Sequence, residues 1–238
     1  MSTNKASFSP HCLAALLQTG DNLFPSGGYA HSYGLEEMVS IGRIKNAEDL
    51  EDFLKDEVLQ CMANLELPYL RYSQMAAEKK DINELLIMNE EISAWKLTRE
   101  VREAGQAQGM QLIRMIKELY DDEWTECFAE KLRSTGESCQ HIVATALLRN
   151  IQSVPQESSF VSWIYQGVSN FASASVKLLR LGEVACQRVI LRSLESDSFK
   201  KTISKAFSVK RNEAGWFNPL LDIASCRHEL AFSRLFIS

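Results

Sequence analysis

Proline and glycine are scarce in this sequence of 238 residues, which contains only five prolines and eleven glycines. Because turn-rich β architectures depend on these residues, their scarcity favours long helices. No stretch approaches the roughly 18 uninterrupted apolar residues of a membrane-spanning helix, so no membrane span is expected. The N-terminus is polar and lacks the apolar core of a signal peptide, which predicts a cytoplasmic protein with residues 1–7 as a flexible N-terminus.

An excess of positive charge is also missing, since the formal net charge is −5. A nucleic-acid-binding surface is therefore not expected. The six cysteines form no Cys-x-x-Cys pair, and the four histidines show no His-x-x-x-His or His-Glu-x-x-His spacing. The cysteines are interpreted as small buried apolar residues, and no local metal site is visible. P-loop, nucleophile-elbow and kinase motifs are absent as well, so the motifs do not indicate an enzyme.

Helical periodicity extends along nearly the whole chain and predicts a single all-α domain, residues 1–238, built as a bundle of roughly ten helices. The clearest amphipathic pattern follows Asn46, a good N-cap, and Pro68 is interpreted as a joint behind it. Residues 93–120 are predicted as one long helix with Leu97 and Leu119 on its core face. Further helices are predicted at 11–19, 69–79, 82–92, 123–132, 137–152, 158–179, 182–194, 199–207 and 219–230, with 208–217 as an exposed loop.

Glycines mark two places where the chain is expected to turn or pack closely. Pro25 fixes its own φ, while Gly27 and Gly28 permit positive φ, so the chain can reverse sharply before a helix predicted at 29–41. Gly34 lies inside that predicted helix and suggests that another backbone packs against it. Gly105 and Gly109 are spaced to let a neighbouring helix approach. The Gly27-Gly28 turn could also cradle an anion at a helix N-terminus, although such turns are more often structural.

Two combinations of side chains could carry chemistry, and each has a simpler interpretation. His31 and Glu36 face different directions on the predicted helix, so His31 is interpreted as a packing residue and Glu36 as part of a solvated acidic face. Cys226 and His228 are the only Cys/His pair close in sequence. They could ligate a metal only across a dimer or with ligands from a second protein. The alternative is a tail that contacts a partner.

The C-terminal end is unusually apolar. Asn218 and Pro219 form a good N-cap and first position of a helix, and the chain then ends with an apolar segment at 231–238. Chain ends are usually polar and frayed, so this tail either docks on its own domain or is covered by a partner. Lys177 lies on a helix with a surface of small residues and is either solvated or interfacial.

Four blocks of sequence stand in a characteristic order. Residues 21–36 read Asp-Asn-Leu-Phe-Pro-Ser-Gly-Gly-Tyr-Ala-His-Ser-Tyr-Gly-Leu-Glu, and residues 97–109 read Leu-Thr-Arg-Glu-Val-Arg-Glu-Ala-Gly-Gln-Ala-Gln-Gly. Residues 173–188 contain Ser-Ala-Ser-Val-Lys-Leu-Leu-Arg-Leu-Gly and then Gln-Arg, and residues 224–236 read Ala-Ser-Cys-Arg-His-Glu-Leu-Ala-Phe-Ser-Arg-Leu-Phe. Together the blocks resemble the urease accessory protein UreF family over nearly the whole chain.

The resemblance has one departure, because Arg180 and Glu183 stand where the family usually has proline and glutamine or histidine. It implies an all-α, dimeric, non-catalytic scaffold with no stably bound cofactor. Such proteins join UreD, also called UreH, and the GTPase UreG. The assembly delivers nickel to apo-urease, with nickel in transit through the complex and GTP bound only by UreG.

The resemblance also implies which residues meet partners, and the tail 231–238 is expected to be ordered by the UreD-like protein. The expected partner-binding residues are Pro25, Gly27, Gly28, His31, Ser32, Gly34, Glu36, Lys177, Arg227, His228, Glu229, Ser233, Arg234, Leu235 and Phe236. Two alternatives stay open. One is a metallochaperone that binds nickel itself through Cys226 and His228 at a dimer interface. The other is a small helical enzyme that uses the Gly27-Gly28 turn to bind an anion.

Overall fold

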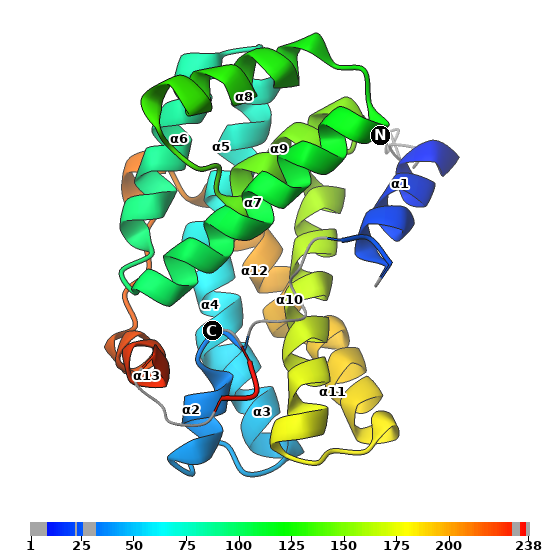
Figure 1. Ribbon diagram of the computed structural model, residues 1–238. Helices are drawn as coiled ribbons and strands as arrows, with labels where there is room; N and C mark the ends of the chain where they lie inside the picture. The colour runs from blue at the N-terminus through cyan, green and yellow to red at the C-terminus, as the bar shows by residue number, and fades with distance from the viewer. Residues whose placement is uncertain (1–8, 22, 26–31, 230–233, 237–238) are drawn as a thin grey trace.

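The computed structural model describes residues 9–21, 23–25, 32–229 and 234–236, with only the backbone of Glu229 (Figure 1). With residues 47–78 counted as one continuous helix, the described residues form eleven helices and no strand. This confirms the predicted all-α bundle of roughly ten helices. Within the described ranges, no helix is long and apolar enough to cross a membrane.

The helices lie within a few residues of their predicted bounds, except at 29–41 and 93–120. Two π-helical turns, Leu54–Val58 and Met62–Glu66, join α3, α4 and α5, and a 3-10 turn at Arg211–Glu213 separates α12 from α13. In chain order the helices are α1 (Pro10–Gly20), α2 (Leu35–Ser40), α3 (Ala47–Phe53), α4 (Leu59–Cys61), α5 (Leu67–Glu78), α6 (Ile82–Trp95), α7 (Arg99–Leu119), α8 (Glu123–Thr135), α9 (His141–Ile151), α10 (Gln156–Leu178), α11 (Glu183–Glu195), α12 (Asp197–Ser208) and α13 (Pro219–Glu229).

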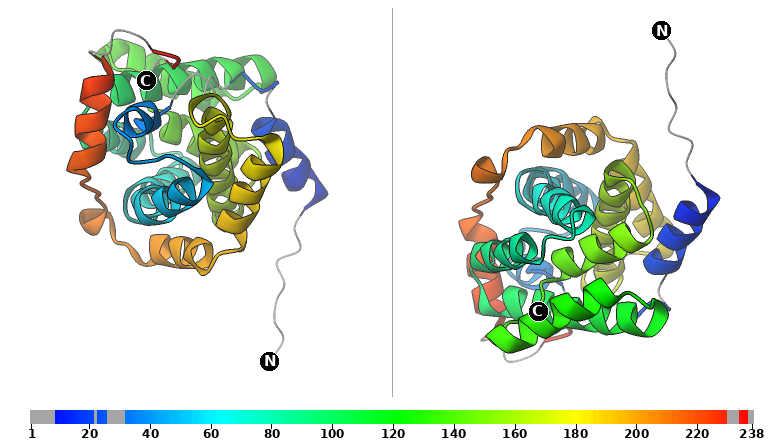
Figure 2. Two further views of the ribbon diagram at one scale, coloured as in Figure 1. Left: turned by 90° about the horizontal axis from the view of Figure 1, so that it is seen from below. Right: turned by 90° about the horizontal axis from the view of Figure 1, so that it is seen from above.

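The continuous helix 47–78 passes through the middle of the bundle, and its α5 part packs against α6, α9, α10 and α12 (Figure 2). Asn46 caps its start, because the side-chain oxygen accepts a hydrogen bond from the Asp49 N–H. The predicted joint at Pro68 is wrong, since the helix continues through it. A proline leaves the carbonyl four residues earlier without its helical donor, and the Gly215 N–H donates to that Asn64 carbonyl at 2.9 Å.

Helix α7 lies across α9, and the close approach predicted for the two glycines is confirmed at Gly109, whereas Gly105 faces the ends of the Gln140 and Lys96 side chains. A Cβ on Gly109 would lie 2.0 Å from the carbonyl oxygen of Cys139, directly before α9. A side chain at this position would therefore push α7 away from α9. Gly109 therefore sets the spacing of these helices.

The long helix predicted at 93–120 is interrupted at Lys96–Thr98, between α6 and α7. The Arg102 guanidinium donates to the Lys96 carbonyl at 2.9 Å, so a side chain replaces the N–H donor that a continuing helix would supply. As a result Leu97 is exposed rather than in the core, and Leu119 at the end of α7 is exposed as well. Both had been predicted on the core face.

The segment predicted as an exposed loop at 208–217 is instead a strap bound to the bundle. Val209 and Ala214 are buried in it. Arg71 donates hydrogen bonds to the carbonyls of Phe207 and Val209, the latter at 2.7 Å. The Arg211 guanidinium lies 2.6 Å from a Glu84 oxygen and 2.7 Å from a Glu91 oxygen, both on α6. Polar composition suggested solvent exposure here, but these polar groups make contacts within the chain.

Replacing Arg211 by glutamine is expected to reduce stability more at neutral pH than in acid. The Arg211 guanidinium lowers the pKa of the Glu91 carboxyl through its hydrogen bond. A lowered pKa in the folded state contributes stability that is present above the unfolded value of about 4.3 and is lost as pH falls through the folded value. The difference between the two proteins in free energy of unfolding, from urea titrations, should shrink as pH falls from about 6 to about 3.

The matched control for this prediction is Lys210→Gln, because Lys210 forms an exposed ion pair with Glu213 in the same strap. That variant should resemble the unmodified chain at every pH. A difference for Arg211→Gln that stays constant across the titration would contradict the role given to Glu91.

Candidate functional site

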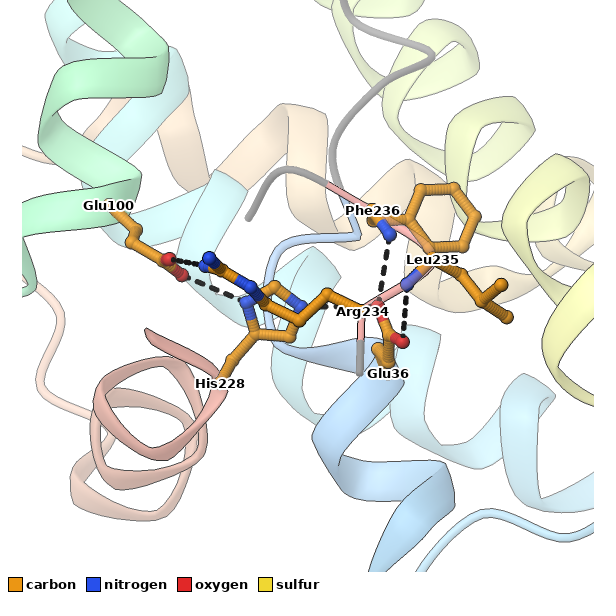
Figure 3. Close-up of polar contacts among 6 residues, drawn as sticks. All are labelled: Glu36, Glu100, His228, Arg234, Leu235 and Phe236. Carbon is orange, nitrogen blue, oxygen red and sulfur yellow. Dashed lines mark hydrogen bonds and ion pairs between the residues drawn. The ribbon is translucent and has the colours of Figure 1, made fainter. Parts of the chain in front are cut away.

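Three helices bring two glutamates and a histidine into contact (Figure 3). Glu36 comes from α2, Glu100 from α7 and His228 from α13. His228 Nδ1 lies 2.9 Å from Glu100 Oε2, and His228 Nε2 lies 3.1 Å from Glu36 Oε2. The histidine side chain is 1% exposed, and those of Glu36 and Glu100 are 14% and 11% exposed. We call these three residues the clasp.

The geometry of the clasp leaves neither ring nitrogen of His228 without a partner. Each nitrogen lies within hydrogen-bond distance of a different glutamate carboxyl group. His228 therefore links α2 to α7 through one buried side chain. Arg234 adds an ion pair, because its guanidinium lies 2.8 Å from the other oxygen of Glu100. Glu100 thus binds the buried His228 with one oxygen and the exposed Arg234 with the other.

Glu36 also holds the C-terminal tail by its backbone. The Leu235 N–H donates to Glu36 Oε1 at 2.9 Å, and the Phe236 N–H donates to Glu36 Oε2 at 3.2 Å (Figure 3). The Phe236 side chain is buried, and Lys177 Nζ on α10 lies 5.6 Å from its ring centroid. Residues 234–236 consequently dock on their own domain, one of the two alternatives for this tail. Ordering of the tail by a partner stays a prediction.

Gly34 lies directly before the helix that carries Glu36, not inside it as predicted. Helix α2 begins at Leu35, and Gly34 is its N-cap with φ +85°, a conformation that glycine adopts readily and most other residues avoid. A Cβ on Gly34 would lie 2.8 Å from Leu221 Cδ1 on α13. The close neighbour is therefore a side chain of α13, not another backbone. This contact packs α13 against α2 and brings His228 within reach of Glu36.

The other predicted site residues fall into three groups. Gly27, Gly28, His31 and Ser233 lie outside the described residues, so the anion cradle and the packing of His31 stay predictions. Pro25 is exposed, Ser32 is buried, and Arg227 is exposed at an ion pair with Glu37 at 3.1 Å. Of Glu229 only the backbone is described, at the end of α13.

The structure changes the interpretation of Glu36 and adds Glu100, which sequence analysis overlooked. Glu36 was predicted to be a solvated acid, which is wrong, because its carboxylate binds His228 and the tail. Glu100 was not singled out, although it stands in the Thr-Arg-Glu segment of the second sequence block. That position was the available signal, since nothing in the helical periodicity of α7 distinguishes Glu100 from an ordinary first-turn acid.

The Cys226–His228 pair is not arranged as a metal site. Cys226 is exposed, whereas His228 is buried with both ring nitrogens directed at carboxylates. Within the described ranges, no group of three or more histidine, cysteine or acidic side chains could hold a metal ion. Nickel binding by this pair at a dimer interface would require His228 to leave both glutamates, and it stays an untested alternative.

A cavity of about 630 Å³ lies beside the clasp helices, between helix 47–78 and parts of α6, α7, α10 and α13. Its described lining includes the acids Glu57, Glu66 and Asp222 together with Lys96 and Cys61. Glu66 accepts a hydrogen bond from Trp163 Nε1 at 2.8 Å. Burial raises the pKa of the Asp222 carboxyl, and burial followed by the charge of Glu66 raises the pKa of the Cys61 thiol. The cavity therefore combines acidic groups with partial exclusion of water.

Comparisons with known proteins agree with the resemblance seen in the sequence. The model of the UreF family matches residues 44–194. The chain is 29% identical over 231 residues to a urease accessory protein UreF from Polynucleobacter asymbioticus, covering 95% of this chain and 97% of that protein. It is 28% identical over 239 residues to a urease accessory protein UreF from Chromohalobacter salexigens, covering 100% of both. A relative of the same name from Marinomonas sp. is 27% identical over 226 residues, or 95% and 94% of the two chains.

Proposed function

Because the chain belongs to the UreF family of urease accessory proteins, which are non-catalytic, we propose that it is the scaffold on which nickel is inserted into apo-urease. In this proposal a homodimer of the chain joins a UreD-type partner and recruits the GTPase UreG in the cytoplasm. The chain regulates the GTPase cycle, and GTP binds only to UreG. The chain itself performs no bond-making step.

The clasp is the observation that carries this proposal. It fixes the backbone of Leu235 and Phe236 on Glu36, while Leu235 remains 63% exposed. An apolar side chain held outward on an ordered segment is a surface that a partner protein can bury. Lys177 supplies a charged group beside the same tail, and Arg227 is exposed at its ion pair with Glu37 on α2. These features support a partner contact at the C-terminal end of the chain, where the UreD-type protein would bind.

The cavity supports the second part of the proposal, the passage of nickel as cargo. Its carboxyl groups, Glu57, Glu66 and Asp222, are oxygen ligands that attract a divalent cation. The described residues provide no closed set of ligands. Weak, separated donors are suited to an ion that passes through rather than one that stays.

The test is co-expression of the full chain with UreD-type and UreG-type partners from one organism, followed by tag capture and light scattering of the eluate. The proposal predicts an assembly that contains all three proteins and two copies of this chain. A monomer that captures neither partner would contradict it. Charge reversal at Lys177, measured in the same assay, asks whether that residue belongs to the partner surface.

A further inference from the structure

Acidic side chains outnumber basic ones in the cavity. Lys96 is the only lysine or arginine among its described lining residues, against Asp21, Glu57, Glu66 and Asp222. Carboxylates attract cations, and the attraction is stronger where water is partly excluded. A cavity lined in this way would attract a divalent cation unless another charge opposed it.

Lys96 is placed to provide that opposing charge. It stands in the break between α6 and α7, where its N–H donates to the Ser93 carbonyl and its own carbonyl accepts from Arg102. Its backbone is therefore held on both sides, while the side chain reaches the cavity. A Cβ on Gly105 would lie 2.5 Å from Lys96 Nζ, so the absence of a side chain at Gly105 leaves room for the ammonium group.

The surroundings of Lys96 connect it to the groups that an entering ion would meet. Its ammonium group interacts electrostatically with Glu66 and with Cys61. Burial lowers the pKa of Lys96, and the charge of Glu66 opposes that change. Cys61 and Glu66 lie on the stretch of helix that contains the two π-helical turns, a distortion often found at functional positions. A cation approaching Glu66 therefore also approaches Lys96.

We propose that the ammonium group of Lys96 keeps divalent cations out of the cavity, so that nickel crosses the chain only when this charge withdraws. This inference rests on the proposed function, in which nickel passes through the chain as cargo. The lysine stem has four rotatable methylene groups, so the charge can move while the backbone at the α6–α7 break stays in place. Lys96 thus acts as a gate by charge repulsion.

The experiment is a titration of the purified full chain with Ni²⁺, followed by tryptophan fluorescence. Trp95, Trp163 and Trp216 line the cavity, so a paramagnetic ion bound there should quench their emission. Lys96→Met keeps the bulk of the side chain and removes its charge. We expect this variant to bind Ni²⁺ about ten-fold or more tightly than the unmodified chain, because the repulsion is gone.

Three further variants make the result specific. Lys96→Arg keeps the charge and should bind as weakly as the unmodified chain. Lys201→Met removes an exposed lysine on α12 and should change nothing. Adding Glu66→Gln to Lys96→Met should reverse most of the gain, which places the bound ion in the cavity. Circular dichroism of each protein checks folding, and Lys96→Gln replaces the methionine variant if that variant does not fold.

Two outcomes would overturn the inference: an unchanged Ni²⁺ affinity in Lys96→Met, or an equal gain in Lys96→Arg. Neither depends on partner proteins. In the co-expression assay the Lys96→Met chain should still capture both partners. Loss of capture by the unmodified chain would count against the proposed function, whereas an unchanged affinity in Lys96→Met would count against the gate alone.

Discussion

Replacing His228 by alanine is expected to lower the free energy of unfolding by about 3 kcal/mol, because it removes the shared hydrogen-bond partner of two largely buried acids. Glu36 and Glu100 would then face each other across the vacated space, each without the partner that His228 supplied. Removing one partner from a buried polar cluster leaves the remaining groups unsatisfied, which costs more than the lost contacts alone. Urea denaturation followed by circular dichroism measures the effect.

Cys226→Ala is the matched control for this variant, since Cys226 lies on the same helix and is exposed. Its free energy of unfolding should stay within about 0.5 kcal/mol of the unmodified value. Limited proteolysis adds a local readout, because loss of His228 should also loosen the tail that Glu36 holds. A His228→Ala chain as stable as the Cys226→Ala chain would mean that the clasp contributes nothing to the fold.

Replacing Gly109 by alanine is expected to be at least as damaging, with a loss of about 3 kcal/mol or more, or failure to fold. The new Cβ would lie 2.0 Å from the Cys139 carbonyl oxygen and 2.7 Å from the Gln140 carbonyl carbon. Both are backbone atoms directly before α9, so no side-chain rotation can relieve the contact. Thermal unfolding, or the soluble yield if the variant does not fold, measures the effect.

Gly20→Ala provides the comparison, because Gly20 ends α1 and a Cβ there would meet no atom within 4 Å. Alanine is the better helix former, so this variant should lie within about 1 kcal/mol of the unmodified chain or slightly above it. A Gly109→Ala chain that unfolds at the same temperature as Gly20→Ala would show that α7 and α9 can separate without cost.

The helices could be predicted from the sequence because their signals are local. Asn46 as an N-cap and the spacing of Gly105 and Gly109 are each visible within a few residues of chain. The joint assigned to Pro68 failed for the opposite reason. The N–H of Gly215 satisfies the freed Asn64 carbonyl. Because Gly215 is far away in the sequence, rules based on neighbouring residues cannot predict this hydrogen bond.

The clasp could be predicted only in part. The tail was singled out by its apolar character and His228 by family resemblance, but both contact residues that are far away in the sequence. His228 is 192 residues from Glu36 and 128 residues from Glu100. A solvated acid and a buried ion-pair acid look alike in a helical pattern, so Glu36 was misassigned and Glu100 was overlooked. Gly34 was recognised as constrained, although the side chain that constrains it belongs to α13.

The central claim is that the clasped tail is the surface by which this scaffold binds its UreD-type partner. The most direct measurement compares partner capture by the full chain with capture by a chain that lacks residues 234–238, with circular dichroism of both. A chain lacking residues 2–7 serves as the control for terminal truncation. The account predicts that capture is lost only in the C-terminal truncation while helical content stays almost unchanged. Undiminished capture by that truncated chain, or a large loss of helix in it, would contradict the claim.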